Sequence, residues 1–114
     1  MDKCLFCKII NKEIDTDIVF ENDRLIAFQD INPQAPLHIL IIPKKHIPTL
    51  NDLETSDKNL VGELIITASE LAQKEGFDKA GYRTVFNCNE MGGQTVYHIH
   101  LHLIAGRNLT WPPG

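Results

Sequence analysis

Three histidines alternate with aliphatic residues near the end of the chain, at His98, His100 and His102. Side chains on a β-strand point to opposite faces in turn, so the three imidazoles would share one face and the aliphatic residues would face the core. Neutral imidazoles spaced in this way can bind zinc or another transition metal. Alternatively, one imidazole can act as a nucleophile while its neighbours orient it and handle protons.

A glycine-containing loop, Gly92-Gly93-Gln94-Thr95, precedes the histidines. Glycines allow backbone N–H groups to point at an anion, and the threonine adds a hydroxyl. The same glycines could equally form a simple hairpin turn. Their position beside the histidines favours a phosphate site, and with it nucleophilic chemistry at phosphorus over a metal hydrolase.

A cysteine pair, Cys4 and Cys7, has the spacing of a metal chelate but supplies only two of the four ligands of a structural zinc site. The alternative is that both are small packing residues on a first helix. Cys88 has no sequence partner and is expected to pack in a strand. Three cysteines cannot all pair within one chain, and without an export signal we expect reduced thiols.

The helices and strands that must position these residues can be predicted from the sequence, and together they indicate an α+β domain. Apolar spacing predicts a short helix over 4–11 and an amphipathic helix of about five turns from 55 to 76. Strands are predicted at 18–20, 25–28, 37–42, 82–89 and 95–105. We expect an antiparallel sheet of about five strands with one long helix and a short N-terminal helix, in a single domain spanning residues 1–114.

Composition excludes several classes of protein. A hydrophobic content of 43% with 23% charged residues is typical of a globular domain rather than a disordered chain. The net charge is −4 and Lys44-Lys45 is the one tight basic cluster, so we expect no nucleic-acid partner. The longest aliphatic run, Ile39–Ile42, is too short to cross a bilayer. We therefore expect a cytoplasmic protein with no membrane partner.

The run from His98 to Ile104 resembles the signature of the histidine triad family, His-φ-His-φ-His-φ-φ, where φ is hydrophobic. The segment 30–36 followed by His38, the segment 42–46, the Gly-Gly-Gln loop and the Trp-Pro-Pro-Gly tail resemble the nucleotide-binding branch of that family. The resemblance covers nearly the whole chain. It implies the histidine triad fold and a hydrolase that cleaves the P–N bond of purine nucleoside phosphoramidates or related aminoacyl or acyl nucleotides.

The resemblance also implies a role for each histidine. His100 would be the nucleophile that forms a nucleotidyl-histidine intermediate, which water then hydrolyses. His102 would support the phosphate, and His38 would join the proton-handling network. The leaving amine must be protonated, and the donor could be His38, His98 or His102.

By the same resemblance, the phosphate would be contacted by Asn87, Gly93, Gln94 and Thr95. Asp30 would accept hydrogen bonds from the ribose hydroxyls. The purine would lie between the apolar side chains of Ile14, Phe28 and Ile31. Without the resemblance, Asp30 could simply begin a turn, and Phe28 and Ile14 could be core residues.

In several histidine triad relatives an N-terminal Cys-x-x-Cys binds zinc together with two histidines, which here would be His46 and His98. Such a zinc ion would be structural, and catalysis would require no cofactor. The resemblance further implies a two-fold homodimer, with the tail at Trp111 near the partner's site. Two alternatives remain open: a nucleotide-binding regulatory or scaffolding module with incidental hydrolysis, and a metalloenzyme that uses His98, His100 and His102.

Overall fold

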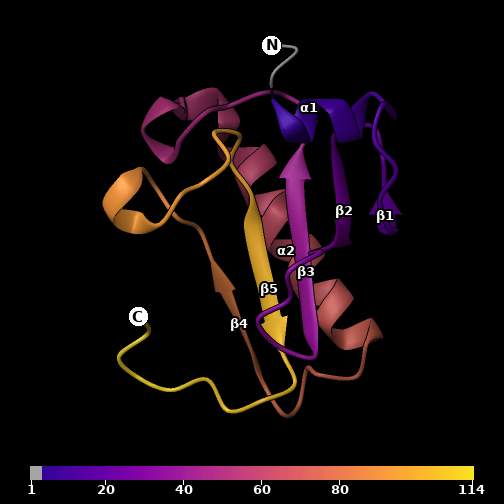
Figure 1. Cartoon of the computed structure of the whole chain (residues 1–114), viewed down its shortest axis with the longest axis vertical. Coiled ribbons are helices and arrows are strands. Elements are labelled where there is room, and N and C mark those ends of the chain that lie inside the picture. The colour runs from indigo at the N-terminus through magenta and orange to yellow at the C-terminus, as the bar shows by residue number, and fades with distance from the viewer. Residues whose placement is uncertain (1–3) are drawn as a thin grey trace.

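A computed structural model describes residues 4–114 of the chain. Five antiparallel strands form one sheet in the order β1-β2-β3-β5-β4. The strands are β1 (Ile18–Glu21), β2 (Leu25–Gln29), β3 (Leu37–Pro43), β4 (Tyr82–Val85) and β5 (Leu101–Ala105). A long helix, α2 (Lys58–Lys74), and a short one, α1 (Leu5–Ile10), complete the domain (Figure 1). The predicted α+β fold is confirmed.

Strand β3 forms the centre of the sheet and is buried along its whole length. Its neighbours are β2 and β5. Ile39 and Ile41 belong to the core beneath α2, whereas Leu40 and Ile42 belong to a separate cluster that includes residues of α1. Alternation places His38 on the same face as Leu40. Both faces of the strand are therefore covered, and all of its residues except His38 are apolar.

Helix α2 packs against β3 and β5 with one apolar face. Its buried aliphatic residues recur at three- and four-residue steps, at Leu60, Leu64, Ala68, Leu71 and Ala72. A 3₁₀ turn at Thr55–Asp57 precedes the helix, and Gly76 follows it with φ +86°, where a glycine is favoured. The predicted helix is confirmed, with its first turn in 3₁₀ form.

The last two strands are shorter than predicted. β4 ends at Val85 rather than residue 89, and β5 begins at Leu101 rather than residue 95. The Ile99 N–H donates to the carbonyl of Ile47 (2.8 Å) instead of extending the ladder with β3. Prediction of one strand carrying all three histidines was therefore wrong, since His98 and His100 precede β5 and only His102 lies on it.

Helix α1 lies on the side of the sheet opposite α2. Its Phe6 and Ile9 side chains are buried against Ile26 and Phe28 of β2. Phe6 meets Phe28 edge-on, with 5.6 Å between ring centroids. Among residues 4–114, no helix combines the length and apolar character that a membrane span requires.

Candidate active site

The imidazole of His100 lies directly before β5 and packs edge-on against Phe6, with 5.0 Å between ring centroids. Its Nδ1 is 2.8 Å from the carbonyl oxygen of His98. A carbonyl can only accept, so Nδ1 carries the proton and the neutral ring has its lone pair on Nε2. Burial lowers the pKa of His100, which favours that neutral form. Nε2 of His100 is therefore suited to nucleophilic attack.

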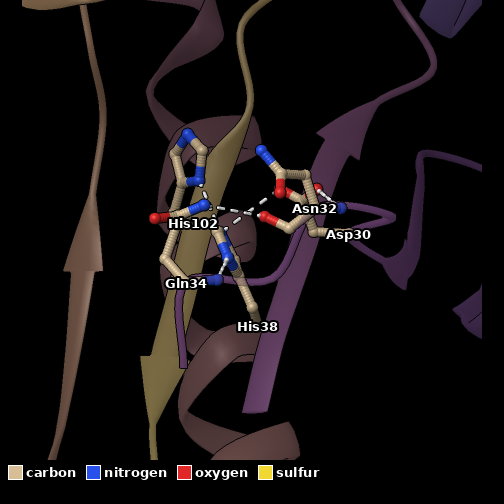
Figure 2. Close-up of polar contacts among 5 residues, drawn as sticks. All are labelled: Asp30, Asn32, Gln34, His38 and His102. Atoms are coloured by element: carbon tan, nitrogen blue, oxygen red, sulfur yellow. Dashed lines mark hydrogen bonds and ion pairs between the residues drawn. The ribbon is translucent and has the colours of Figure 1, made fainter. Parts of the chain in front are cut away.

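Two further imidazoles, His38 on β3 and His102 on β5, contact each other (Figure 2). The ring of His102 also lies beside that of His100, with 5.0 Å between ring centroids. The backbone N–H of Gln34 donates to Nδ1 of His38 (3.0 Å). An accepting Nδ1 carries no proton, so neutral His38 has its proton on Nε2, which lies 2.9 Å from Nδ1 of His102. His102 then accepts at Nδ1 and carries its own proton on Nε2.

Nε2 of His102 is buried and has no hydrogen-bond partner among the described residues. Buried polar groups are nearly always hydrogen-bonded, so this unpaired donor is an exception among the described side chains. Burial, followed by the neighbouring His100 and His38, lowers the pKa of His102 to about 4. His102 is therefore held as a neutral ring with an unpaired N–H group.

The carboxylate of Asp30 follows β2 and lies beside the histidine pair (Figure 2). Its Oδ1 accepts the Asn32 N–H (2.8 Å), and its Oδ2 is 3.4 Å from Nε2 of His38. Burial lowers the pKa of His38, an effect that the Asp30 charge partly opposes. A carboxylate has about four lone-pair positions, which leaves acceptors on Asp30 for ligand hydroxyls.

An apolar cleft of about 170 Å³ adjoins Asp30. The predicted base-binding residues Ile14, Phe28 and Ile31 all line it. Leu40 also lines it and pairs with His102 in the β3–β5 register, so the cleft and the histidines are neighbours. The volume lies below the range of about 300–1,000 Å³ that drug-sized ligands occupy, and suits one flat ring system.

Sequence reasoning missed three apolar residues of this cleft, Leu5, Ile9 and Leu40. The spacing of Leu5 and Ile9 places them on one face of α1, and such apolar spacing does not distinguish a core face from a cleft wall. Leu40 lies within an unbroken aliphatic run, which hides the face toward which it points. The Gln34 N–H left no sequence signal, because any residue except proline supplies this group.

The glycine loop satisfies most of its donors internally. Gln94 is buried: its side chain accepts the Asn89 N–H (2.8 Å) and donates to the carbonyls of Pro48 (2.7 Å) and Val96 (3.1 Å). The Gly93 N–H donates to the Glu90 carbonyl (3.0 Å). These bonds give Gln94 and Gly93 loop-shaping roles and do not support their predicted phosphate contacts. Asn87 is half-buried and Thr95 is exposed beside this loop, so both stay predicted phosphate contacts.

The four predicted metal ligands Cys4, Cys7, His46 and His98 converge, with their donor atoms within 4.8 Å of one another. Sγ of Cys7 is 3.3 Å from Nδ1 of His46, which is 3.1 Å from Nδ1 of His98. Cys4 Sγ lies 3.5 Å from the same His98 atom. Zinc bonded tetrahedrally to two thiolates and two imidazoles separates its ligands by about 3.3–3.8 Å. The donor set therefore fits zinc.

The tautomer of His98 also suits a metal ligand. Its Nε2 lies 2.7 Å from the carbonyl of Pro43, so the proton is on Nε2 and the Nδ1 lone pair faces the cysteines. Hydrogen bonds of this kind typically orient metal-binding histidines. His98 consequently contributes its ring to this cluster and its carbonyl to His100.

The three triad imidazoles do not form a metal site of their own. The ring of His98 faces Cys4 and Cys7, while Nδ1 of His100 is committed to a carbonyl. Donor atoms of Asp30, His38 and His102 also converge within 4.8 Å. However, Nε2 of His38 carries a proton when Gln34 donates to Nδ1, so it offers no lone pair to a metal.

Comparison with known proteins identifies relatives that match almost the whole chain. A family model described as "Scavenger mRNA decapping enzyme C-term binding" matches residues 3–110. Purine nucleoside phosphoramidase of Escherichia coli K12 is 49% identical over 108 residues, covering 95% of this chain and 91% of that protein. An uncharacterized HIT-like protein of Synechococcus elongatus is 51% identical over 110 residues, or 96% of each chain.

Solved structures are similar as well. The crystal structure of a HIT family hydrolase from Legionella pneumophila superposes with a TM-score of 0.97 at 58% sequence identity, covering 98% of this chain and 100% of that one. A histidine triad protein from Clostridium difficile gives a TM-score of 0.92 at 44% identity, with 96% of this chain and 95% of that one covered.

Proposed function

Because this chain belongs to the histidine triad family, we propose that it is a hydrolase that cleaves the P–N bond of purine nucleoside phosphoramidates or related aminoacyl or acyl nucleotides. The observation that carries the proposal is the ring of His100, whose Nδ1 proton is held by the His98 carbonyl while Nε2 keeps its lone pair. The unpaired Nε2–H of the adjacent His102 supplies a donor for a phosphate oxygen.

In the first step, Nε2 of His100 attacks the α-phosphorus. The P–N bond breaks, its electron pair goes to the leaving nitrogen, and that nitrogen takes up a proton. The resulting nucleotidyl-imidazolium keeps its Nδ1–H on the carbonyl of His98, which stabilises the positive charge. In the second step, water attacks phosphorus, the P–Nε2 electron pair returns to His100, and a proton is released. The sum consumes one water and yields an amine and a nucleoside monophosphate.

The nucleoside would lie in the apolar cleft. Phe28 and Ile14 would contact the faces of the purine, and Asp30 would accept hydrogen bonds from the ribose hydroxyls. Since Asp30 lies between this cleft and His38, a ribose held there directs the 5′-phosphate toward the histidines. Fixing the substrate in this way lowers the entropic part of the barrier.

The test compares the native chain with His100→Ala on adenosine 5′-phosphoramidate. We expect the variant to lose at least about a thousandfold in kcat, because the nucleophile acts only in the reaction. Its affinity for AMP, measured by calorimetry, should stay within about threefold. Intact-mass analysis of quenched native enzyme should detect a nucleotidyl adduct that the variant lacks. Unchanged turnover in the variant contradicts the mechanism, and AMP binding without turnover by the native chain indicates a binding module.

We also propose that Cys4, Cys7, His46 and His98 hold a structural zinc ion. All four tetrahedral positions would be protein ligands, which leaves none open for substrate and assigns the metal to stability. It would tie α1 to the segment that precedes β5, and α1 forms one wall of the nucleoside cleft. Elemental analysis of purified protein should find about one zinc per chain.

A two-fold homodimer is the third part of the proposal. β4 is an edge strand, and an uncovered edge tends to pair with another chain. Ile66 on α2 is 60% exposed and Trp111 of the tail is 82% exposed, so both side chains are available to a partner chain. Sedimentation velocity should give the mass of two chains, and a concentration-independent single-chain mass would contradict it.

A further inference from the structure

The loop between β2 and β3, residues 30–36, is anchored from outside the histidine cluster. Nε of Arg107, which follows β5, donates to the carbonyl of Gln34 (2.9 Å). Gly106 lies so close to Pro36 that an added Cβ would be 2.8 Å from the proline Cβ. At the other end of the loop, the Asn32 N–H donates to Asp30. The loop is therefore held at both ends and at Gln34.

Gln34 connects this anchor to the histidines. Its carbonyl accepts from Arg107. Its N–H donates to Nδ1 of His38, as Figure 2 shows. Both groups flank one α-carbon, so fixing the carbonyl restricts rotation that would take the N–H away from His38. Pro33, directly before Gln34, has its φ fixed by the ring and restricts the loop further.

We propose that Arg107 is a positioning residue that, through Gln34, locks His38 and His102 as neutral Nε2–H tautomers and so makes His102 a hydrogen-bond donor to the phosphate rather than its general acid. The phosphate contact rests on the proposed function, whereas the tautomers do not. Arg107 itself is exposed and makes its contacts with the carbonyls of Gln34 and Asn108.

The lock follows from the donors and acceptors along the chain of contacts. A cationic His102 would carry a proton on Nδ1, which would face the Nε2 proton of His38 across 2.9 Å. His38 could relieve this only by moving its proton to Nδ1, and that atom faces the Gln34 N–H at 3.0 Å. Protonating His102, or moving the His38 proton to Nδ1, therefore places two N–H donors face to face.

The surrounding charges do not remove this constraint. Asp30 and His100 are the titratable groups that act on the pair from outside it. Asp30 favours a cation on His38 or His102, but burial outweighs it and lowers the pKa of both rings. The leaving amine consequently takes its proton from solvent or carries it on binding, not from His102.

The direct test is NMR of ¹⁵N-labelled imidazoles, which distinguishes Nδ1–H, Nε2–H and cationic rings and needs no turnover. At pH 7 the native chain should show His38 and His102 as neutral Nε2–H tautomers. Arg107→Met, which removes the donor but keeps the length, should shift both rings toward mixed tautomers and protonate His102 at higher pH. Arg107→Lys should restore the native spectrum in part.

Arg24→Met is the matched control, because Arg24 is an exposed arginine that contacts Glu63 (3.1 Å) away from this loop. Its spectrum should equal the native one. A native spectrum with the proton on Nδ1 of His38, or an Arg107→Met spectrum equal to that of Arg24→Met, overturns the proposal. Thermal unfolding of each variant establishes that folded proteins are compared.

Kinetics provide the second arm. On adenosine 5′-phosphoramidate, Arg107→Met should lower kcat about tenfold with KM within about twofold, less than direct removal of an oxyanion donor. The variant should also gain an acidic limb in its kcat–pH profile that native enzyme, Arg24→Met and Arg107→Lys lack. Equal losses in all pH ranges would assign Arg107 a general structural role and overturn the lock. If the native chain hydrolyses no phosphoramidate, the proposed function fails while the NMR arm still decides the tautomers.

Discussion

Replacing Gly106 by alanine tests the close packing that holds the loop over the histidines. Gly106 has φ +101°, and an added Cβ would lie 2.8, 3.0 and 3.2 Å from Cβ, Cγ and Cδ of Pro36. The proline ring cannot rotate away, so the loop itself must move. Gly81 is a matched control, because it has a similar φ of +112° but no atom within 4 Å of an added Cβ.

The expected magnitudes separate backbone strain from steric clash. An L-residue in this left-handed region costs about 1–2 kcal/mol, and both variants incur that cost. Overpacking against Pro36 adds about 1–3 kcal/mol in Gly106→Ala alone. We therefore expect the free energy of unfolding to fall by about 1–2 kcal/mol in Gly81→Ala and by about 2–5 kcal/mol in Gly106→Ala.

Urea denaturation at pH 7, monitored by circular dichroism, measures both losses. The NMR spectrum of Gly106→Ala should also show the altered His38 tautomer, because the displaced loop carries the Gln34 N–H. Gly81→Ala should keep the native spectrum. Equal losses of stability in the two variants would refute the reasoning that Gly106 and Pro36 form a tight contact.

Three further results are expected. Ile31→Ala should raise the Kd for AMP about fivefold without changing the free energy of unfolding, since Ile31 lines the cleft but is 95% exposed; calorimetry and urea denaturation measure the two effects. Cys7→Ser should lose bound zinc and lower Tm, whereas Cys88→Ser should retain both, and equal zinc contents would contradict the site. The free energy of unfolding of the native chain should fall as the pH is lowered from 6.5 to 4, because the unfolded chain protonates His102 near pH 6.5 while burial holds the folded pKa at about 4. In urea titrations, His102→Gln should reduce this fall by about 1–2 kcal/mol. The same pH dependence in the variant as in the native chain would refute the prediction.

The regular elements were predictable wherever local periodicity and burial agree. The apolar steps of α2 and the unbroken aliphatic run of β3 each admit one sensible assignment. The predicted strand at 95–105 is longer than β5 because the alternation of residue types is visible in the local sequence, whereas the contacts that interrupt the strand come from distant segments. His98 is buried by contacts with Pro43 and Cys4, which lie 55 and 94 residues away in sequence. No local pattern contains such partners.

Site residues were predictable as a set, but their individual roles were not. The four metal candidates lie together in the structure, and the three base-binding candidates line one cleft. Both groups were predictable because each came from a motif that specifies residue types. The family resemblance predicts Gln94 on the phosphate, whereas in the structure its side-chain amide bonds the backbone of Asn89 and Pro48. A sequence shows that a polar side chain is present, but only its hydrogen-bond partners in the fold show whether it remains available to a ligand.

The spacing His-x-His-x-His leaves the three imidazoles chemically equivalent, and main-chain groups from different segments make them distinct. The Pro43 carbonyl takes Nε2–H of His98 and leaves Nδ1 for the cysteine cluster. The carbonyl of His98 accepts Nδ1–H of His100 and leaves the lone pair of the ring on Nε2. The Gln34 N–H acts through His38 and leaves His102 as a donor. Because these partners are backbone groups, substitutions that move the chain at such positions should alter the chemistry even when every histidine is retained.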